Sequence, residues 1–103
     1  MANLIGALVS GFFLFNAIPH LVQGILGKRH MTPFSRESAA VINVIWGWIN
    51  IIVGVVIMVA AWPGKEESAL LWWVVFSLGG LIISLYLAVF WSNPDARLPW
   101  HKK

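Results

Sequence analysis

The stretch from Ala39 to Trp62, AAVINVIWGWINIIVGVVIMVAAW, decides the fold of this chain. Its 24 residues include no charged side chain. About 20 consecutive apolar residues suffice for a helix to cross the hydrocarbon core of a bilayer. In lipid the backbone has to satisfy its own hydrogen bonds, so the many β-branched residues do not argue for a strand. The stretch therefore predicts a membrane-spanning helix.

Two other runs have the same character. The run Leu4–Leu26 is interrupted by a few polar or helix-disturbing residues, and Ala69–Ser92 contains no charge. Only 11% of the chain is charged, whereas a soluble domain carries about 25%. The sequence predicts an all-α integral membrane bundle of three transmembrane helices, at about 4–26, 39–62 and 69–92. They form one membrane domain over residues 1–103, with a short cytoplasmic tail at 93–103.

Capping and turn residues mark the ends of the three runs. Gly27 suits the C-cap of the first helix. Thr32-Pro33 offers an N-cap and a first helical position for the second helix. Pro63-Gly64 ends the second run, and Ser68 can cap the third helix.

Pro19 leaves a second interpretation of the first run open. Proline lacks an amide hydrogen and disturbs the preceding helical turn. The first helix could therefore end there, followed by a re-entrant or interfacial stretch over residues 20–27. A continuous helix and a broken one are both compatible with the sequence.

The basic residues gather on one side of a three-span topology. Three crossings place the first loop and the tail on the same side, which holds six of the seven Lys and Arg residues. Cytoplasmic loops are enriched in such residues. We predict a multi-pass protein of the cell (plasma) membrane, with its N-terminus outside and its C-terminus in the cytoplasm. The first-loop residues Lys28, Arg29 and Arg36 are candidates for contact with anionic lipid headgroups, or serve only to orient the chain.

Polar side chains lie within the predicted spans. Asn16 and His20 share one stripe of the first helix, and Asn43 and Asn50 share one face of the second. When the helices are folded about their loops, His20 reaches the depth of Asn43, and Asn16 that of Asn50. Tyr86 falls near the level of Asn43. We interpret these five residues as a candidate ligand-binding polar cluster, with hydrogen bonding that merely packs the helices as the alternative.

Small residues form a seam along each predicted helix. Such seams let membrane helices approach closely. Gly80 falls at the depth of Asn50 when the second and third helices are folded together. The predicted helix-packing positions are Gly24, Gly47, Gly54, Ser77, Gly80 and Ser84.

The residue set restricts the chemistry. There is no cysteine, so disulfides and thiolate-bound metals are excluded. No carboxylate lies within a span, which argues against a proton pump with a buried acid. His20 is the only histidine in the spans, so a single chain offers too few ligands for a metal site there. A haem held by two His20 residues across a dimer is a further hypothesis. The sequence gives no catalytic triad, no nucleic-acid face and no identified cofactor.

The stretch from Asn16 to Phe34 carries a resemblance. Its Pro19-His20, Gly27-Lys28-Arg29 and Thr32-Pro33-Phe34 motifs resemble those of small, functionally uncharacterised bacterial membrane proteins, and more loosely the DoxX-like group. The resemblance implies a compact multi-span protein of a bacterial inner membrane. DoxX-like proteins generally have four helices where this chain has room for three, and no functional residue is transferred from them.

Three functions remain open from the sequence. Three helices bury little surface among themselves, so we predict self-association or docking onto a larger membrane protein. The leading hypothesis is a non-enzymatic, self-associating or partner-binding membrane subunit with a buried Asn/His cluster. The alternatives are a protomer of an oligomeric channel or small-solute carrier, and a small membrane enzyme that acts on a lipid or quinone with His20 as acid or base.

Overall fold

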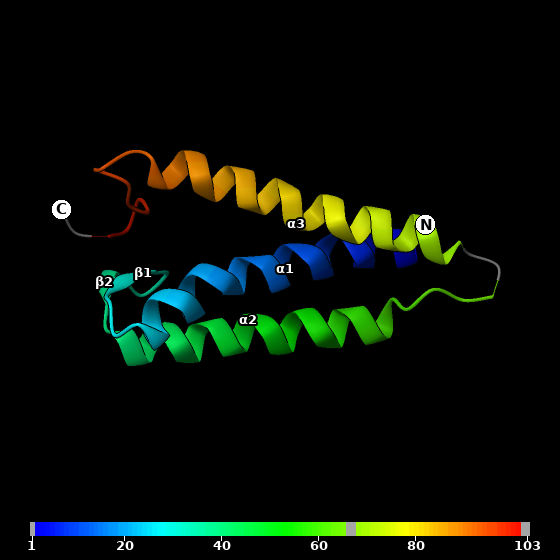
Figure 1. Cartoon of the computed structure of the whole chain (residues 1–103), viewed down its shortest axis with the longest axis horizontal. Coiled ribbons are helices and arrows are strands. Elements are labelled where there is room, and N and C mark those ends of the chain that lie inside the picture. Colours follow the sequence, from blue (N-terminus) through cyan, green and yellow to red (C-terminus); the bar gives the residue numbers. More distant parts are fainter. Residues whose placement is uncertain (1, 66–67, 102–103) are drawn as a thin grey trace.

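The computed structural model describes residues 2–65 and 68–101 and consists of three long helices and one short hairpin (Figure 1). Each helix is long and apolar enough to cross a membrane. The predicted all-α bundle of three transmembrane helices is confirmed, with every helix end within two residues of its expected position. The elements are α1 (Ala2–Ile25), β1 (His30–Thr32), β2 (Ser35–Ser38), α2 (Ala40–Ala60) and α3 (Ala69–Trp91).

Helix α1 runs between α2 and α3 and packs against both, whereas α2 and α3 share no extensive contact (Figure 1). Small residues permit these contacts. On α2, Gly54 receives the side chain of Leu14 from α1. On α3, Gly79 lies against the carbonyl oxygen of Leu8, so the two backbones meet there without an intervening side chain. The bundle is therefore organised around α1, with an open side between its two neighbours.

Helix α1 continues through Pro19 and ends in a glycine cap, so the alternative of a break at Pro19 is not adopted. Gly27 has a φ of +75°, a conformation in which glycine carries no Cβ penalty. The amide of Gly27 donates to the carbonyl of Gly24 at 3.0 Å, and that of Lys28 to the carbonyl of Gln23 at 2.9 Å. These two bonds form a Schellman motif, which confirms the predicted C-cap at Gly27.

The segment between α1 and α2 corrects one prediction. Thr32-Pro33 does not cap α2; it belongs to an antiparallel β1–β2 hairpin in which Thr32 pairs with Ser35. The hydroxyl of Thr32 lies 2.6 Å from that of Ser38 and also accepts from the amide of Phe34 at 3.2 Å. Because the hydroxyl is used within the hairpin, it is not available to a helix, and α2 begins at Ala40 after an N-cap residue, Ala39, with no side-chain cap.

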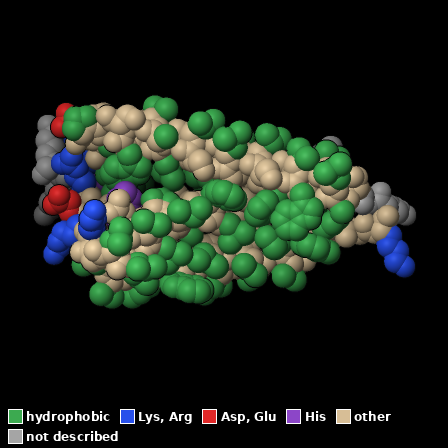
Figure 2. Space-filling model, in the orientation of Figure 1, with side chains coloured by type: hydrophobic (Ala, Val, Ile, Leu, Met, Phe, Trp, Pro, Cys, Tyr) green, Lys and Arg blue, Asp and Glu red, His purple; other side chains and the backbone are tan. Residues whose placement is uncertain are grey.

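The opposite end of the bundle agrees closely with the prediction from the sequence. Helix α2 ends at Ala60, shortly before Pro63-Gly64. The hydroxyl of Ser68 accepts from the amide of Leu71 at 3.2 Å, which confirms the predicted cap of α3. Lys65 lies at this end, while the other described Lys and Arg residues lie at the hairpin end (Figure 2).

Candidate functional site

A buried hydrogen-bond network centres on Asn43, one turn into α2. The side chain of Asn43 is fully buried. Its Oδ1 lies 2.9 Å from Nδ1 of His20 on α1. Its Nδ2 donates to the carbonyl oxygens of His30, Ser38 and Ala39 at 2.9, 3.0 and 3.2 Å. One asparagine thus joins α1, the hairpin and the start of α2, and the expected match in depth between His20 and Asn43 is present.

A second polar pair lies nearer the middle of the bundle. Nδ2 of Asn16 donates to Oδ1 of Asn50 at 3.1 Å, and Nδ2 of Asn50 donates to the carbonyl of Trp46 at 2.9 Å. Asn50 is buried, whereas Asn16 is half-buried. The pairing of Asn16 with Asn50, also expected from depth, joins α1 to α2.

A pocket of about 150 Å³ lies beside these two pairs. Asn16 and His20 of α1 form its floor, Trp46 of α2 lies on one side, and Tyr86 and Phe90 of α3 lie on the other. Figure 2 shows this end of the bundle hollowed between α2 and α3, with a histidine side chain visible inside. The pocket exists because α2 and α3 do not close over α1 here.

Tyr86 belongs to the pocket but not to the hydrogen-bonded layer. It is 60% exposed, and its ring stacks on that of Phe90 at a centroid distance of 6.0 Å. Four of the five predicted cluster residues are therefore joined in two hydrogen-bonded pairs, and Tyr86 faces them across the pocket from α3.

His30, in β1, is a pocket residue that the sequence did not single out. Its ring meets that of His20 edge-on at 5.3 Å and lies 4.4 Å from the ring of Trp91. Its Nε2 is buried without a hydrogen-bond partner. Burial, together with the neighbouring His20, lowers the pKa of His30 from 6.5 to about 4. His30 is therefore a neutral wall of the pocket near pH 7.

The C-terminal segment folds back over the hairpin end of the pocket. The guanidinium of Arg36 donates to the carbonyls of Pro94 and Ala96 at 3.0 and 3.3 Å. Nε1 of Trp100 donates to the carbonyl of Pro33 at 2.7 Å. These bonds hold the segment after α3 against the hairpin, and Leu98 from this segment lines the pocket.

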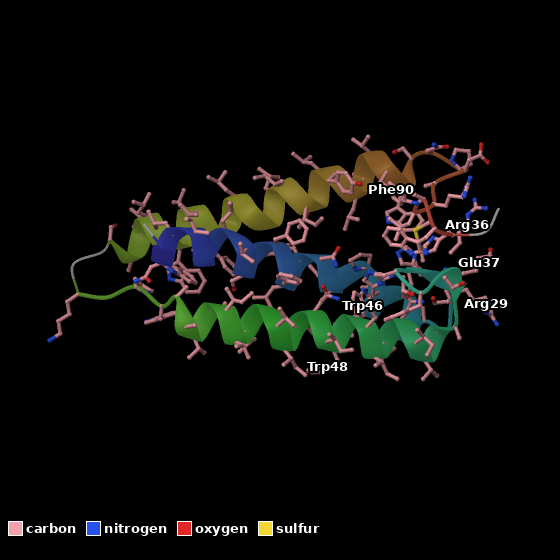
Figure 3. All side chains as sticks on the ribbon, turned by 180° about the vertical axis from the view of Figure 1, so that it is seen from behind. Arg29, Arg36, Glu37, Trp46, Trp48 and Phe90 are labelled. Atoms are coloured by element: carbon pink, nitrogen blue, oxygen red, sulfur yellow. The ribbon has the colours of Figure 1, made fainter. Side chains whose placement is uncertain are left out.

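The three candidate headgroup cations differ in their surroundings. Arg36 is engaged with the C-terminal segment, and Arg29 donates to the carbonyl of Glu37 at 3.0 Å. Lys28 is exposed. Figure 3 shows Arg29, Arg36 and Glu37 together at the hairpin end, with Trp48 on the outer side of α2. Contact of these cations with lipid headgroups stays a prediction.

All four of the predicted packing glycines lie at helix contacts: Gly24, Gly47, Gly54 and Gly80. Gly80 receives the ring of Phe15, and Gly24 faces the backbone of Ala40. Ser77 and Ser84 are exposed, and each donates to a carbonyl four residues earlier in α3, at 2.8 and 2.7 Å. A packing role for these two serines, between copies of the chain, stays a prediction.

Two features of the first helix went unpredicted. Ser10 is fully buried and donates to the carbonyl of Gly54 at 2.8 Å. Gly11 lies against the carbonyl of Phe76. The spacing of Gly6 and Ser10, and of Ala7 and Gly11, is the small-residue pattern of a helix interface, which was the signal available in the sequence.

The fold and the site together define a small multi-pass membrane protein with a mostly apolar pocket, lined by a few polar side chains, at one end of its bundle. Comparison with models of protein families, with curated proteins and with solved structures finds no match to this chain. The resemblance to the DoxX-like group stays a prediction. The function has to be inferred from the geometry of the pocket.

Proposed function

We propose that this chain is a non-enzymatic binding subunit of the plasma membrane that holds a lipid-soluble small molecule in the pocket between α2 and α3. The observation that carries the proposal is the pocket itself. Hydrogen-bonding side chains of α1 line its floor and aromatic side chains of α2 and α3 its sides. Apolar pockets with a few convergent polar groups are the usual form of small-molecule sites.

The setting of the pocket supports a ligand drawn from the bilayer. The side chains of α2 and α3 that face outward are largely exposed aliphatic residues, as expected of surfaces in contact with lipid. The two helices have no extensive contact with one another. A molecule dissolved in the membrane can therefore approach α1 from the side, without passing through water.

Recovery of the ligand tests this proposal. Protein purified in mild detergent is extracted with organic solvent and the extract is analysed by mass spectrometry. Leu87→Trp places a large side chain in the pocket lining, and Leu81→Trp makes the same change outside it on the same helix. We expect a compound that accompanies the native chain and Leu81→Trp but is depleted in Leu87→Trp. Identical extracts from all three proteins would contradict a binding function.

The proposed orientation places the hairpin end in the cytoplasm and the N-terminus outside. It is supported by the concentration of described Lys and Arg residues at the hairpin end, against Lys65 alone at the other (Figure 2). A reporter that is active only in the cytoplasm, fused after the last residue, should be active. Activity of a periplasmic or extracellular reporter at the same position would reverse the assignment.

Self-association is a second candidate, favoured by the outer surface of α3. Ser77 and Ser84 are exposed and seven residues apart, so two small polar side chains follow one side of a helix that lipid would otherwise cover. The chain has no cysteine, so a single introduced thiol reports on its own position. Ser77→Cys should form a disulfide-linked dimer in membranes more readily than Val89→Cys. Equal yields would count against this surface.

A further inference from the structure

The hydrogen bonds of Asn43 determine the protonation of His20. The Nδ2 group of Asn43 faces three carbonyl oxygens, all acceptors, so this atom is the amide nitrogen. The atom facing His20 is consequently the amide oxygen, which can only accept. Nδ1 of His20 therefore carries the hydrogen, and in the neutral ring Nε2 is left with its lone pair.

That lone pair is available to a ligand. Nε2 of His20 has no hydrogen-bond partner among the described residues, and it is not sealed from the surface as Nε2 of His30 and Nε2 of His101 are. His20 lines the pocket. The floor of the pocket thus presents a hydrogen-bond acceptor, and the complementary group on a ligand is a donor.

The charges around the pocket select a neutral ligand. Among the residues that the structure describes, no Lys or Arg lines the pocket. The guanidinium of Arg36 donates to the carbonyls of Pro94 and Ala96. Arg36 lines the neighbouring hollow, on the other side of His30 and Trp91, and not the pocket itself. His30 stays neutral near pH 7 because burial and His20 lower its pKa to about 4. A phosphate or carboxylate in the pocket would find no cation in this described lining to balance its charge, and burial of an unpaired charge is costly.

The size and lining of the pocket favour a flat head. Aromatic side chains of Trp46, Phe90 and Trp91 contribute to its walls. Its volume is about 150 Å³. A cavity of about this size in another protein accommodates benzene. One substituted ring therefore fits, and a longer tail has to leave through the open side between α2 and α3.

We propose that the pocket binds a neutral, lipid-soluble molecule whose planar head carries a hydroxyl group, the chemistry of a quinol or an alkylated phenol, with that hydroxyl donating to Nε2 of His20. The proposal rests on the proposed binding function and adds the class of ligand. The bond from Nδ1 of His20 to Asn43 leaves Nε2 as the nitrogen of that ring without a partner among the described residues.

Three matched probes test the class of ligand. 4-Octylphenol can donate a hydrogen bond, 4-octylanisole has the same shape without the donor, and 4-octylbenzoate is anionic. Binding is measured by equilibrium dialysis against the full chain in phosphatidylcholine nanodiscs, with partitioning into empty discs subtracted. We expect the phenol to bind roughly tenfold more tightly than the anisole, which corresponds to one hydrogen bond, and the benzoate to bind weakest.

Pocket variants locate the binding. Leu87→Trp should abolish phenol binding, while Leu81→Trp should leave it unchanged. His20→Phe should remove the preference for the phenol over the anisole; because this variant also breaks the bond to Asn43, its folding is checked by tryptophan fluorescence. The comparison of probes on the unaltered chain decides the question even if His20→Phe does not fold.

The outcomes separate this inference from the proposed function. Equal binding of phenol and anisole, tighter binding of the benzoate, or absence of binding by the phenol would each overturn the inference. Depletion of a native lipid from Leu87→Trp would then still support a binding subunit with another class of ligand. A phenol preference that survives in Leu87→Trp would also overturn the inference, because the probe would be bound elsewhere.

Discussion

At the hairpin end of the bundle, α1 meets α2 through side-chain hydrogen bonds, whereas at the opposite end aromatic rings fill the space between helices. The hairpin end has Asn43 bonded to His20 and to three carbonyls. The opposite end has Trp72, fully buried, with Nε1 donating to the carbonyl of Ala61 at 2.7 Å. Trp73 and Phe76 lie against it at 4.9 and 5.7 Å between ring centroids.

The difference shows how the same helices make a filled end and a hollow end. Indole rings and a close approach of Gly6 to Ala61 fill the end near the α2–α3 connection. Hydrogen bonds are directional, so at the hairpin end they fix the positions of Asn43 and His20 without filling the volume beside them. A site for a ligand is therefore expected at the polar end.

Replacing Asn43 should have the largest effect on stability. Asn43→Leu keeps the approximate volume but removes the bond to His20 and the donor to three carbonyls. We expect a loss of about 3 kcal/mol in the free energy of unfolding, since buried groups are left unpaired. Titration with sodium dodecyl sulfate, followed by tryptophan fluorescence in mixed micelles, measures the loss.

Asn50→Leu is the matched control for that measurement. Asn50 bonds to one side chain on another helix, Asn16, and otherwise to its own helix. Its replacement should cost about 0.6 kcal/mol, the average for an interhelical hydrogen bond in a membrane protein. If Asn43→Leu and Asn50→Leu lowered the free energy of unfolding equally, the hydrogen bonds of Asn43 would contribute no more to stability than the Asn16–Asn50 pair does.

A methyl group at Gly79 should produce the next largest effect. Its Cβ would meet the carbonyl oxygen and backbone of Leu8, so α1 and α3 have to separate. We expect Gly79→Ala to lower the free energy of unfolding by about 2 kcal/mol. Gly64→Ala, where a Cβ meets nothing within 4 Å, should change it by less than about 0.5 kcal/mol. A tolerated alanine at Gly79 would contradict the backbone contact between α1 and α3.

Hydropathy and rise per residue predicted much of this architecture. The three helices followed from uncharged runs, because a backbone in lipid has few alternatives. The His20–Asn43 and Asn16–Asn50 pairs followed from depth, because a helix rises 1.5 Å per residue and short loops bring equal depths together. These inferences use only local sequence and geometry, which is why they were accessible.

The hairpin and the pocket could not be predicted, because both depend on tertiary contacts that no local sequence pattern indicates. Thr32 is a residue type that is favoured at helix N-caps, but its hydroxyl forms a hydrogen bond with that of Ser38 instead. Trp100 bonds to Pro33 across 67 positions of the chain. His30 entered the pocket because the hairpin folds back toward α1. Each of these outcomes follows from tertiary contacts between segments whose local patterns are weak.

Loss of the hydrogen bond from Trp72 to Ala61, at the filled end, should lower the free energy of unfolding less than the changes at Asn43 and Gly79 do. Trp72→Phe removes the donor to Ala61 but leaves an aromatic ring in the cluster. We expect a loss of about 1 kcal/mol in the same detergent titration. Trp73→Phe, at a position 42% exposed, should cost less. If Trp73→Phe were the more damaging change, ring packing rather than the bond to Ala61 would hold this end.

The smallest predicted effect is the pH dependence of stability. It distinguishes the two ends because the hairpin end contains the titratable His30. Burial and His20 lower the pKa of His30 from 6.5 to about 4, so a proton binds the unfolded chain more readily than the folded one. The stability contributed by neutral His30 is complete above about pH 6.5 and is lost as the pH falls toward 4. Because His30 is half-buried and partly screened, we expect a loss below about 1 kcal/mol.

Detergent titrations at pH 7.5 and pH 4.5 measure this loss, and His30→Phe provides the control because it keeps a ring against Trp91 without a titratable nitrogen. Trp72→Phe alters the filled end, where the described residues include no histidine, so it should keep the native pH dependence. His30→Phe should be less sensitive to acid than the native chain. A native and a His30→Phe protein with the same pH dependence would place the acid-sensitive group elsewhere, and the hairpin end would then differ from the filled end in packing alone.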